Sequence, residues 1–394
     1  MFSVPRHQFV LVFPVPLLEV RDLNVRYRIS RYTVAGLTDR GIVGELTRYM
    51  RILEAGNFDA VYDNIKASIS REIDLYRSLG FFNVYALNDI SINVREGTIL
   101  AIVGESGCGK STLARTIIRV LPPNATVDGE VILEGENLLE LPEIKLNLLR
   151  AKQIGYIGQG SYTYLNPLMT SAYQIFESAI VAKEDFKEAT KSFLEAIENI
   201  DIDTKLLLSF PERLSSGQIR RVAFAIAMAK EPKLLICDEP FRNLDVYHAK
   251  QLAYLLRELI GKFDTTALIF THNISLMAEI ADEMAIMYHG TIVERGAIED
   301  IFRQPYHPYS KGLIGALPDI RNPRKRIVYV PGEPLLRIIR PAFCPFFNRC
   351  PIATEECMKA LPKPSKFDGR LISCVRVDEV WDKTPSEFWG PYIN

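Results

Sequence analysis

The sequence predicts an α/β fold built on a mostly parallel β-sheet with helices on both faces. Three apolar runs, at 98–103, 233–237 and 265–271, have the length and composition of buried strands, and the first is rich in β-branched residues. Segments with helical spacing lie between these runs, and strands that alternate with helices form parallel sheets. Glycine or polar residues follow each run directly, at the strand ends where such sheets bind ligands.

Length and composition agree with this fold. The 394 residues are enough for one large domain with attachments or for two domains, and the formal net charge is −1. Such a charge predicts no bulk attraction to nucleic acid or to an anionic membrane. No uninterrupted apolar run reaches the roughly 18 residues of a membrane span. The apolar stretch Phe9–Leu18 contains Pro14 and Pro16, and we expect it to lead into the first strand rather than to act as a signal peptide.

The first element with chemical meaning is the stretch "GESGCGKST", residues 104–112. It fits G-x-x-x-x-G-K-[ST] between a strand that ends at Val103 and a helix with Leu113, Ile117 and Val120 on one face. Glycines let successive backbone N–H groups point at an anion, and the helix start adds its positive dipole end. A chance glycine-rich turn would not have this strand and helix around it.

This pattern predicts a nucleotide phosphate site with a role for each polar residue. Lys110 reaches the β and γ phosphates, the Ser111 hydroxyl binds Mg²⁺, and Thr112 lies on the α-phosphate side. Cys108 is interpreted as a small filler, the alternative being a thiol acidified by the helix start. The predicted phosphate-binding residues are Gly104, Ser106, Gly107, Gly109, Lys110, Ser111 and Thr112.

The second and third strands end in candidate catalytic residues. Asp238 is predicted to hold Mg²⁺ and Glu239 to orient or deprotonate the attacking water, the alternative being that the two acids cap a helix. His272 is predicted to hydrogen-bond the γ phosphate, the alternative being a structural histidine. All three residues are expected at the same edge of the sheet as Gly104.

The stretch "RLSSGQIRRV", with Leu214–Gln218 at the start of a helix, resembles the signature of ATP-binding cassette (ABC) ATPases. In that family two cassettes face head to tail, and each signature helix points its N-terminus at the γ phosphate of ATP held by the other. The resemblance makes Ser215 and the Gly217 N–H donors across the interface, with Gln218 beside them. Ser216 stands where the family pattern has glycine, which implies a weaker site and an unequal pair of cassettes.

Further landmarks match the same family. "YIGQ" resembles the segment of the glutamine switch, so Gln159 is expected to sense Mg²⁺ and the attacking water. Tyr27 matches the aromatic residue that stacks on adenine, the alternative being a surface tyrosine of an edge strand. The resemblance implies an ABC cassette with an N-terminal antiparallel part and a helical subdomain at about 160–217 that touches the membrane partner.

An insertion of about 55 residues, at about 29–83, interrupts this pattern. Its stripes every three or four residues predict helices, which we interpret as a pair packed on the domain surface, the alternative being a docking element for a subunit. The stripes are Val61, Ile65, Ile69 and Ile73, with a weaker one at Ile42, Leu46, Tyr49 and Leu53.

The C-terminal part resembles the ATPases of oligopeptide and dipeptide importers, through "FRQPYHPYSKGLIGALP" and "YVPGEPL". The expected domains are therefore a cassette at 1–305 and an extension at 306–394. The resemblance implies an ATPase on the cytoplasmic face of the membrane that powers uptake of di- or oligopeptides, or of oligosaccharides. Its expected partners are a second, non-identical ATPase subunit, two transmembrane permease subunits and, indirectly, an extracellular substrate-binding protein, without nucleic acid.

Four of the six cysteines, Cys344, Cys350, Cys357 and Cys374, lie in this extension as C-x5-C-x6-C-x16-C. Thiols stay reduced in the cytoplasm, which favours a metal site over disulfides outside thermophiles. The spacings are wider than the C-x2-C hooks of zinc sites, so we predict a [4Fe–4S] cluster, with Zn²⁺ as the alternative. Its role is expected to be structural.

Two other functions compete with the importer ATPase. A soluble cassette acting on ribosomes or DNA would co-purify with RNA rather than with membrane proteins, and the chain lacks the basic face that this role requires. A non-hydrolysing regulatory cassette would not need an intact Glu239 and His272. The sequence leaves open the transported substrate and the identity of the second cassette.

Overall fold

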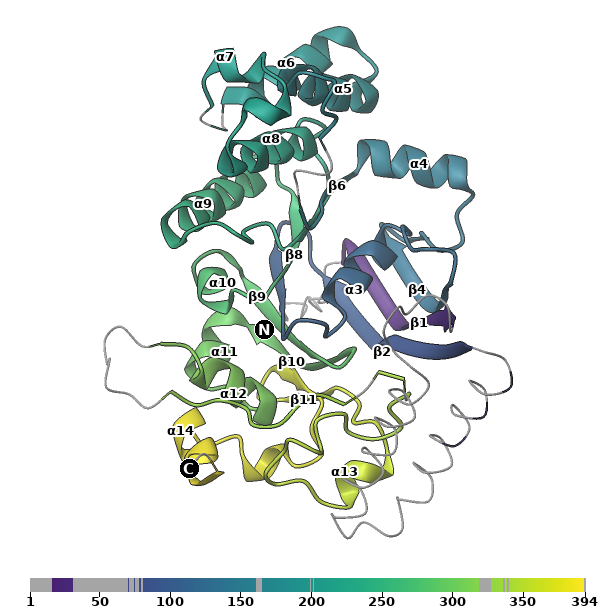
Figure 1. Cartoon of the computed structure of the whole chain (residues 1–394), viewed down its shortest axis with the longest axis vertical. Helices are drawn as coiled ribbons and strands as arrows, with labels where there is room; N and C mark the ends of the chain where they lie inside the picture. The colour runs from purple at the N-terminus through teal and green to yellow at the C-terminus, as the bar shows by residue number, and fades with distance from the viewer. Residues whose placement is uncertain are drawn as a thin grey trace, which may run out of the picture.

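The structure is a computed structural model that describes residues 16–30, 70, 74, 78, 81–160, 165–198, 200, 202–318, 327–335, 337–338 and 340–392. Figure 1 shows a central sheet with an antiparallel sheet beside it, a helical part at one end and the C-terminal extension at the other. Of the described helices, none is both long and apolar enough to cross a bilayer.

The central sheet has eight described strands in the order β11-β12-β10-β9-β3-β8-β7-β6. The strands from β9 to β6 pair in parallel, and the strands from β9 to β11 pair antiparallel. Their bounds are β3 Ile99–Val103, β6 Ile154–Ile157, β7 Leu234–Asp238, β8 Thr266–Thr271, β9 Glu283–Tyr288, β10 Thr291–Ala297, β11 Ser365–Phe367 and β12 Arg370–Ile372.

Both faces of the parallel strands are buried, which explains why their sequences are continuously apolar. Along β3, Ala101 and Val103 pack into a core with the helices α9 (Val246–Lys262) and α10 (Ile274–Ile280). Leu100 and Ile102 point to the opposite core, which contains α3 and the antiparallel sheet. The predicted α/β layering therefore follows from burial on two sides.

The antiparallel sheet has the order β2-β1-β4-β5 and packs its apolar face on α3 and the central sheet. Its strands are β1 Leu18–Ser30, β2 Phe81–Val94, β4 Ala125–Leu133 and β5 Glu136–Asn137. The predicted insertion lies between Ser30 and Phe81. Of its residues, Ser70, Asp74 and Ser78 are described, and they are helical and exposed. The apolar stripes predicted there lie outside the described residues.

Helix α3, Lys110–Ile117, buries Leu113 and Ile117 as predicted. The prediction that Val120 belongs to the same face is wrong, because its side chain is 52% exposed. The helix ends at Ile117, and Arg119 has a φ of 53°, a left-handed conformation that cannot continue an α-helix. The chain then passes through α4, Glu143–Lys152, to β6.

A helical subdomain follows β6 and has a hydrophobic core of its own, built around Ile175, Ala196 and Val222. Figure 1 shows it at the end of the molecule opposite the C-terminal extension. Its elements are α5 Ser171–Lys183, α6 Phe186–Glu198, α7 Thr204–Leu207, η2 Pro211–Arg213 and α8 Ser216–Met228.

The C-terminal extension shares the core of the cassette. Tyr309, Phe346 and Trp389 belong to the same buried cluster as strands β3, β7 and β8, and β12 pairs with β10. The extension therefore packs into the core of the cassette through these residues. The remaining elements are α11 Ile298–Arg303, α12 Pro308–Gly315, α13 Glu356–Lys359, η3 Val377–Glu379, α14 Pro385–Trp389 and η4 Gly390–Tyr392.

Candidate nucleotide-binding site

A cavity of about 540 Å³ lies where β3, β7 and β8 end. It brings together nine of the residues predicted from the sequence, which are Ser106, Gly107, Gly109, Lys110, Ser111, Thr112, Gln159, Glu239 and His272. Arg242, Asn243 and Arg337 complete the lining. Three separate motifs thus meet at one edge of the sheet, as the parallel topology requires.

Two glycines of the loop are required by close packing. A Cβ on Gly104 would lie 2.2 Å from the Met287 carbonyl oxygen. Gly109 has a φ of 112°, and a Cβ there would lie 2.7 Å from the Ala86 carbonyl oxygen. Gly109 is the N-cap of α3, so the backbone N–H groups of the loop lie at the positive end of that helix.

Lys110 is folded back into the loop. Its side chain is buried, and Nζ donates hydrogen bonds to the carbonyl oxygens of Gly104 at 2.8 Å and Glu105 at 3.2 Å. These carbonyls hold the ammonium beside the space into which the loop N–H groups point. Cys108 is buried next to Lys110, and burial raises the pKa of its thiol, which favours the filler interpretation over the acidified thiol.

Ser111 and Asp238 form the next pair. The Ser111 hydroxyl donates to Asp238 Oδ1 at 3.0 Å, while Asp238 Oδ2 is buried and has no hydrogen-bond partner among the described residues. Burial raises the pKa of Asp238, although the Ser111 hydrogen bond opposes this shift. An orphaned carboxylate oxygen beside a hydroxyl is the kind of hard oxygen donor set that Mg²⁺ prefers.

Glu239 and His272 form a hydrogen-bonded pair across β7 and β8. His272 Nδ1 lies 2.9 Å from Glu239 Oε1, and the Thr271 hydroxyl donates to Glu239 Oε2 at 3.3 Å. Glu239 has a φ of 52° directly after β7, a conformation that costs energy for a residue with a side chain. The helix-cap alternative for the two acids does not apply, because no described helix starts at Asp238 or Glu239.

Tyr27 lies on β1 next to the start of α3. Its hydroxyl is 3.4 Å from Thr112 Oγ1, although Tyr27 is not part of the cavity lining. The structure therefore places the Tyr27 hydroxyl beside the end of the phosphate loop, and stacking of its ring on adenine stays a prediction.

The signature residues lie elsewhere. Ser215 caps α8, where its hydroxyl accepts from the Gln218 N–H at 3.3 Å and Gln218 Oε1 accepts from the Ser215 N–H at 2.9 Å. Ser215, Gly217 and Gln218 are not part of the cavity lining. A Cβ built on Gly217 meets nothing within 4 Å, so this helix start faces open space. A residue that binds the nucleotide of a second chain would lie at an exposed helix N-terminus of this kind.

Three lining residues were not predicted as site residues. Arg242 and Asn243 lie three and four positions after Glu239 and could have been included on proximity alone. Arg337 comes from the C-terminal extension, and nothing in its local sequence distinguishes it from Arg340.

The four cysteines of the extension line one small cavity together with Phe346 and Arg376. None of the six cysteines of the chain is paired in a disulfide. Backbone N–H groups of Phe346, Ile352 and Arg376 each donate to the sulfur of the cysteine two positions earlier, which is Cys344, Cys350 or Cys374. Burial raises the pKa of Cys344, raises that of Cys350 to about 12, and raises that of Cys374 to about 11.

The described side chains include no set of three or more His, Cys, Asp or Glu arranged to hold a metal ion. The four cysteines therefore share a cavity, but their sulfurs are not arranged as a metal-binding group. The free volume of this cavity is about 10 Å³, room for about one water molecule.

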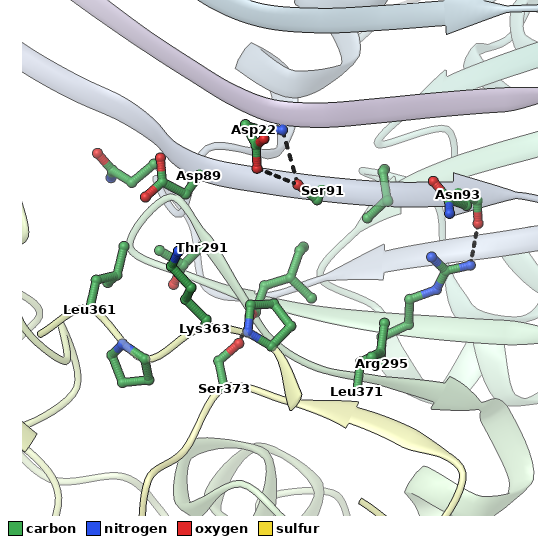
Figure 2. Close-up of a pocket in the computed structure, with 15 residues that line it drawn as sticks. Asp22, Asp89, Ser91, Asn93, Thr291, Arg295, Leu361, Lys363, Leu371 and Ser373 are labelled. Carbon is green, nitrogen blue, oxygen red and sulfur yellow. Dashed lines mark hydrogen bonds between the residues drawn. The ribbon is translucent and has the colours of Figure 1, made fainter. Parts of the chain in front are cut away.

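A second hollow of about 540 Å³ lies between β2, β10 and the C-terminal extension, as Figure 2 shows. Its acidic residues and its arginine are already satisfied: Asp22 accepts from Ser91 at 3.2 Å, Asp89 accepts from Asn24 at 2.9 Å, and Arg295 pairs with Glu283 at 2.7 Å. We assign no site to it.

The ABC transporter family model matches residues 87–242, and the model of the oligopeptide/dipeptide transporter C-terminal region matches residues 293–357. The chain is 38% identical over 301 residues to the oligopeptide transport ATP-binding protein OppD of Salmonella typhimurium, which covers 75% of this chain and 89% of that protein. It is 33% identical over 302 residues to the dipeptide transport ATP-binding protein DppD of Bacillus subtilis, covering 75% of this chain and 90% of that protein.

Among solved structures, cbiO1 from Clostridium perfringens, part of the ABC transporter complex cbiONQ, superposes with a TM-score of 0.53. The alignment covers 73% of this chain and 91% of cbiO1 at 23% identity, which shows a shared fold.

The phosphate loop, the paired acids and the sheet that carries them define a nucleotide-binding cassette. The chain belongs to the ABC transporter family, in the group of ATP-binding proteins that includes the OppD and DppD relatives. The predicted fold class and the family resemblance are therefore confirmed.

Proposed function

We propose that this chain is the ATP-hydrolysing subunit that powers uptake of di- or oligopeptides through a membrane ABC importer. The observation that carries the proposal is the convergence of Lys110, the Ser111–Asp238 pair and the Glu239–His272 pair on one cavity. The peptide cargo rests on the similarity to oligopeptide and dipeptide transport proteins across both the cassette and the C-terminal region. Oligosaccharide remains the alternative cargo.

In this proposal Lys110 turns from the loop carbonyls to the β and γ phosphates of ATP. Ser111 Oγ and the unpartnered Asp238 Oδ2 would hold Mg²⁺, directly or through water, and Gln159 would complete this side of the site. When bound, the metal neutralises charge on the terminal phosphates. The residues fit this role because they offer hard oxygen donors at the end of a buried strand.

Glu239 is proposed to accept a proton from the attacking water, and His272 to fix the orientation of its carboxylate. Glu239→Gln is expected to bind ATP normally and to lower the rate of hydrolysis by at least about 100-fold, because the base is lost while the shape is kept. Single-turnover hydrolysis and equilibrium ATP binding measure the two properties. Glu258→Gln, an exposed change on α9, is the matched control.

Survival of hydrolysis in Glu239→Gln at near the control rate would contradict the base assignment. Absence of hydrolysis in the unmodified protein, alone and with its partner cassette, would favour the regulatory alternative.

The exposed start of α8 supports a head-to-tail pair of cassettes. Ser215 and the Gly217 N–H would donate to a γ phosphate held by the partner cassette, and Gln218 would hold the serine in place through the capping box. Ser216 adds a side chain at this contact, which favours a partner of different sequence. Chemical cross-linking from a cysteine placed at position 216, with and without ATP, would test this arrangement.

The four cysteines are proposed to hold a [4Fe–4S] cluster that stabilises the extension. Support comes from the shared cavity, from the N–H donors to three of the sulfurs, and from cysteine spacings wider than the C-x2-C hooks of zinc sites. The free volume is smaller than such a cluster, so the loops that carry the cysteines must open outward to admit it.

The cluster predicts brown protein with broad absorption near 400 nm after anaerobic purification. A colourless protein that contains stoichiometric zinc would contradict the cluster and support the zinc alternative. A protein that contains neither metal would contradict both.

The working location is proposed to be the cytoplasmic face of the membrane, on two permease subunits, with a substrate-binding protein acting outside. Deletion of the gene should abolish uptake of labelled peptide, and affinity purification should recover membrane subunits. Recovery of ribosomal RNA instead would favour the soluble alternative.

A further inference from the structure

We infer that Arg337, which belongs to the C-terminal extension, is a direct ligand of the nucleotide phosphates. This inference rests on the proposed function, since it assumes that ATP occupies the cavity beside Lys110. It adds to the cassette a binding residue that lies more than 200 positions from the phosphate loop in sequence.

The position of Arg337 is fixed from the cassette side. Its carbonyl oxygen accepts from the Tyr85 N–H at 2.8 Å, and its Nη1 donates to the Ala86 carbonyl oxygen at 3.1 Å. The same Ala86 oxygen lies 2.7 Å from the place of a Cβ on Gly109, the N-cap of α3. The guanidinium is therefore held beside the N-terminus of α3, where the loop would bind phosphate. It lines the same cavity as Gly109 and Lys110.

The guanidinium is incompletely satisfied. Nη2 is buried, and none of the described residues accepts a hydrogen bond from it. None of the ion pairs found among the described residues involves Arg337, and burial lowers its pKa. Burying a cation without a partner is costly, so this arrangement calls for an anion that the described part of the chain does not supply.

The neighbours of Arg337 cannot supply that anion at neutral pH. Burial raises the pKa of the Cys108 thiol, and it raises that of Tyr288 to about 12. His289 has a pKa lowered to about 3, by burial and by the nearby Arg337 charge, so it is neutral. A planar guanidinium matches the oxygens of a phosphate group, and the cavity already holds Lys110 for the same purpose.

The test is equilibrium binding of ATP and of ADP to the full-length chain. Arg337→Met is expected to weaken ATP binding roughly 10- to 100-fold, the range for losing a charge-assisted hydrogen bond to phosphate. Arg337→Lys, which keeps the charge, is expected to recover part of this loss. Arg340→Met, an exposed arginine three positions later, is the matched control and should bind as the unmodified protein does.

Thermal unfolding separates ligand binding from a structural role. Removal of a buried, unpaired charge should leave the unfolding midpoint of nucleotide-free Arg337→Met equal or higher, while the rise in midpoint on adding ATP becomes smaller. A lower nucleotide-free midpoint with an unchanged ATP-induced rise would overturn the inference. Arg337→Gln, which keeps a donor for the Ala86 carbonyl, gives the same readout should the methionine variant fail to fold.

Lys110→Ala separates this inference from the proposed function. Weak ATP binding by Lys110→Ala together with normal binding by the Arg337 variants would overturn the inference and leave the proposed function intact. Absence of ATP binding in the unmodified chain would overturn the proposed function itself, and the inference with it.

Discussion

Glu105 shows how single residues from the extension control the phosphate loop. Arg349 meets its carboxylate with two hydrogen bonds, Nη1 to Oε2 at 3.0 Å and Nη2 to Oε1 at 3.2 Å. The Tyr309 hydroxyl accepts from the Glu105 N–H at 3.1 Å. Arg349 is itself held by the carbonyls of Val330 and Pro331. The Arg349 side chain is 4% exposed and the Glu105 side chain is 33% exposed, so solvent screens this ion pair mainly from the carboxylate side.

Arg349→Ala is therefore expected to raise the KM for ATP roughly 5- to 30-fold, since the loop loses a paired, hydrogen-bonded contact of about 1–2 kcal/mol. Steady-state ATPase kinetics measure this change. Arg349→Lys should give a smaller rise, because lysine keeps the charge but not the two-pronged contact. Arg303→Ala, which breaks an exposed pair with Asp300, is the control. An unchanged KM in Arg349→Ala would show that the loop is rigid without the extension.

For single residues, the sequence predicts the local motifs but not the contacts between residues that are far apart along the chain. The loop residues from Gly104 to Thr112 were recognisable because backbone curvature and phosphate chemistry act within nine consecutive positions. Arg349 lies 244 positions after Glu105, and Arg337 lies 251 positions after Ala86. A lone arginine in a loop carries no periodicity or spacing that could reveal such partners.

Helix α8 shows how one element combines stability with a contact surface. Its first turn is closed by the reciprocal hydrogen bonds of Ser215 and Gln218, while its buried face packs on the helical subdomain core through Ile219 and Val222. The same serine is the proposed donor to the partner's nucleotide. A single substitution therefore mixes a loss of helix capping with a loss of nucleotide contact.

Two substitutions at Ser215 separate these effects. Ser215→Ala should lower the free energy of unfolding by about 1 kcal/mol and also weaken ATP-dependent pairing of cassettes. Ser215→Asp should keep the cap, because aspartate is a good N-cap residue, yet abolish pairing by placing a negative charge against the γ phosphate. Denaturant unfolding and sedimentation with ATP measure the two outcomes. Normal pairing of Ser215→Asp would show that α8 does not meet the partner's nucleotide.

Elements were predicted best where burial dictates the pattern. The three apolar runs became β3, β7 and β8 because each is covered on both faces. The end of α3 was predicted less well: Val120 continues the helical spacing, but the left-handed Arg119 turns the chain first. Apolar spacing does not encode where a helix must stop to enter the next sheet.

The extension and the cassette are joined as one body by buried charge as well as by apolar packing. Glu294 on β10 is fully buried and accepts from the N–H groups of Tyr306 and His307 at 2.9–3.1 Å. Arg370 on β12 donates to the same carboxylate at 3.3 Å and lies 3.4 Å from the centre of the Tyr306 ring. The Glu294 carboxylate thus connects β10 to the start of the extension, at Tyr306 and His307, and to β12 through Arg370.

Removing the negative charge of Glu294 should uncouple the extension from the cassette. Glu294→Gln leaves Arg370 buried without a charged partner, which is expected to cost roughly 3 kcal/mol of unfolding free energy. The two tryptophans of the chain, Trp381 and Trp389, both lie in the extension, so their fluorescence reports on it, whereas far-UV circular dichroism reports mainly on the cassette helices. Glu299→Gln, an exposed change on α11, is the control.

The unmodified protein should give coincident transitions by the two probes, because Trp389 and Phe346 belong to the same core as β3, β7 and β8. In Glu294→Gln the fluorescence transition should move to lower denaturant than the dichroism transition. Since Arg337 and Arg349 reach the phosphate loop from the extension, ATP binding should weaken over the range in which only the extension has unfolded. Separate transitions in the unmodified protein would contradict the shared core and would make the extension an independently folded domain.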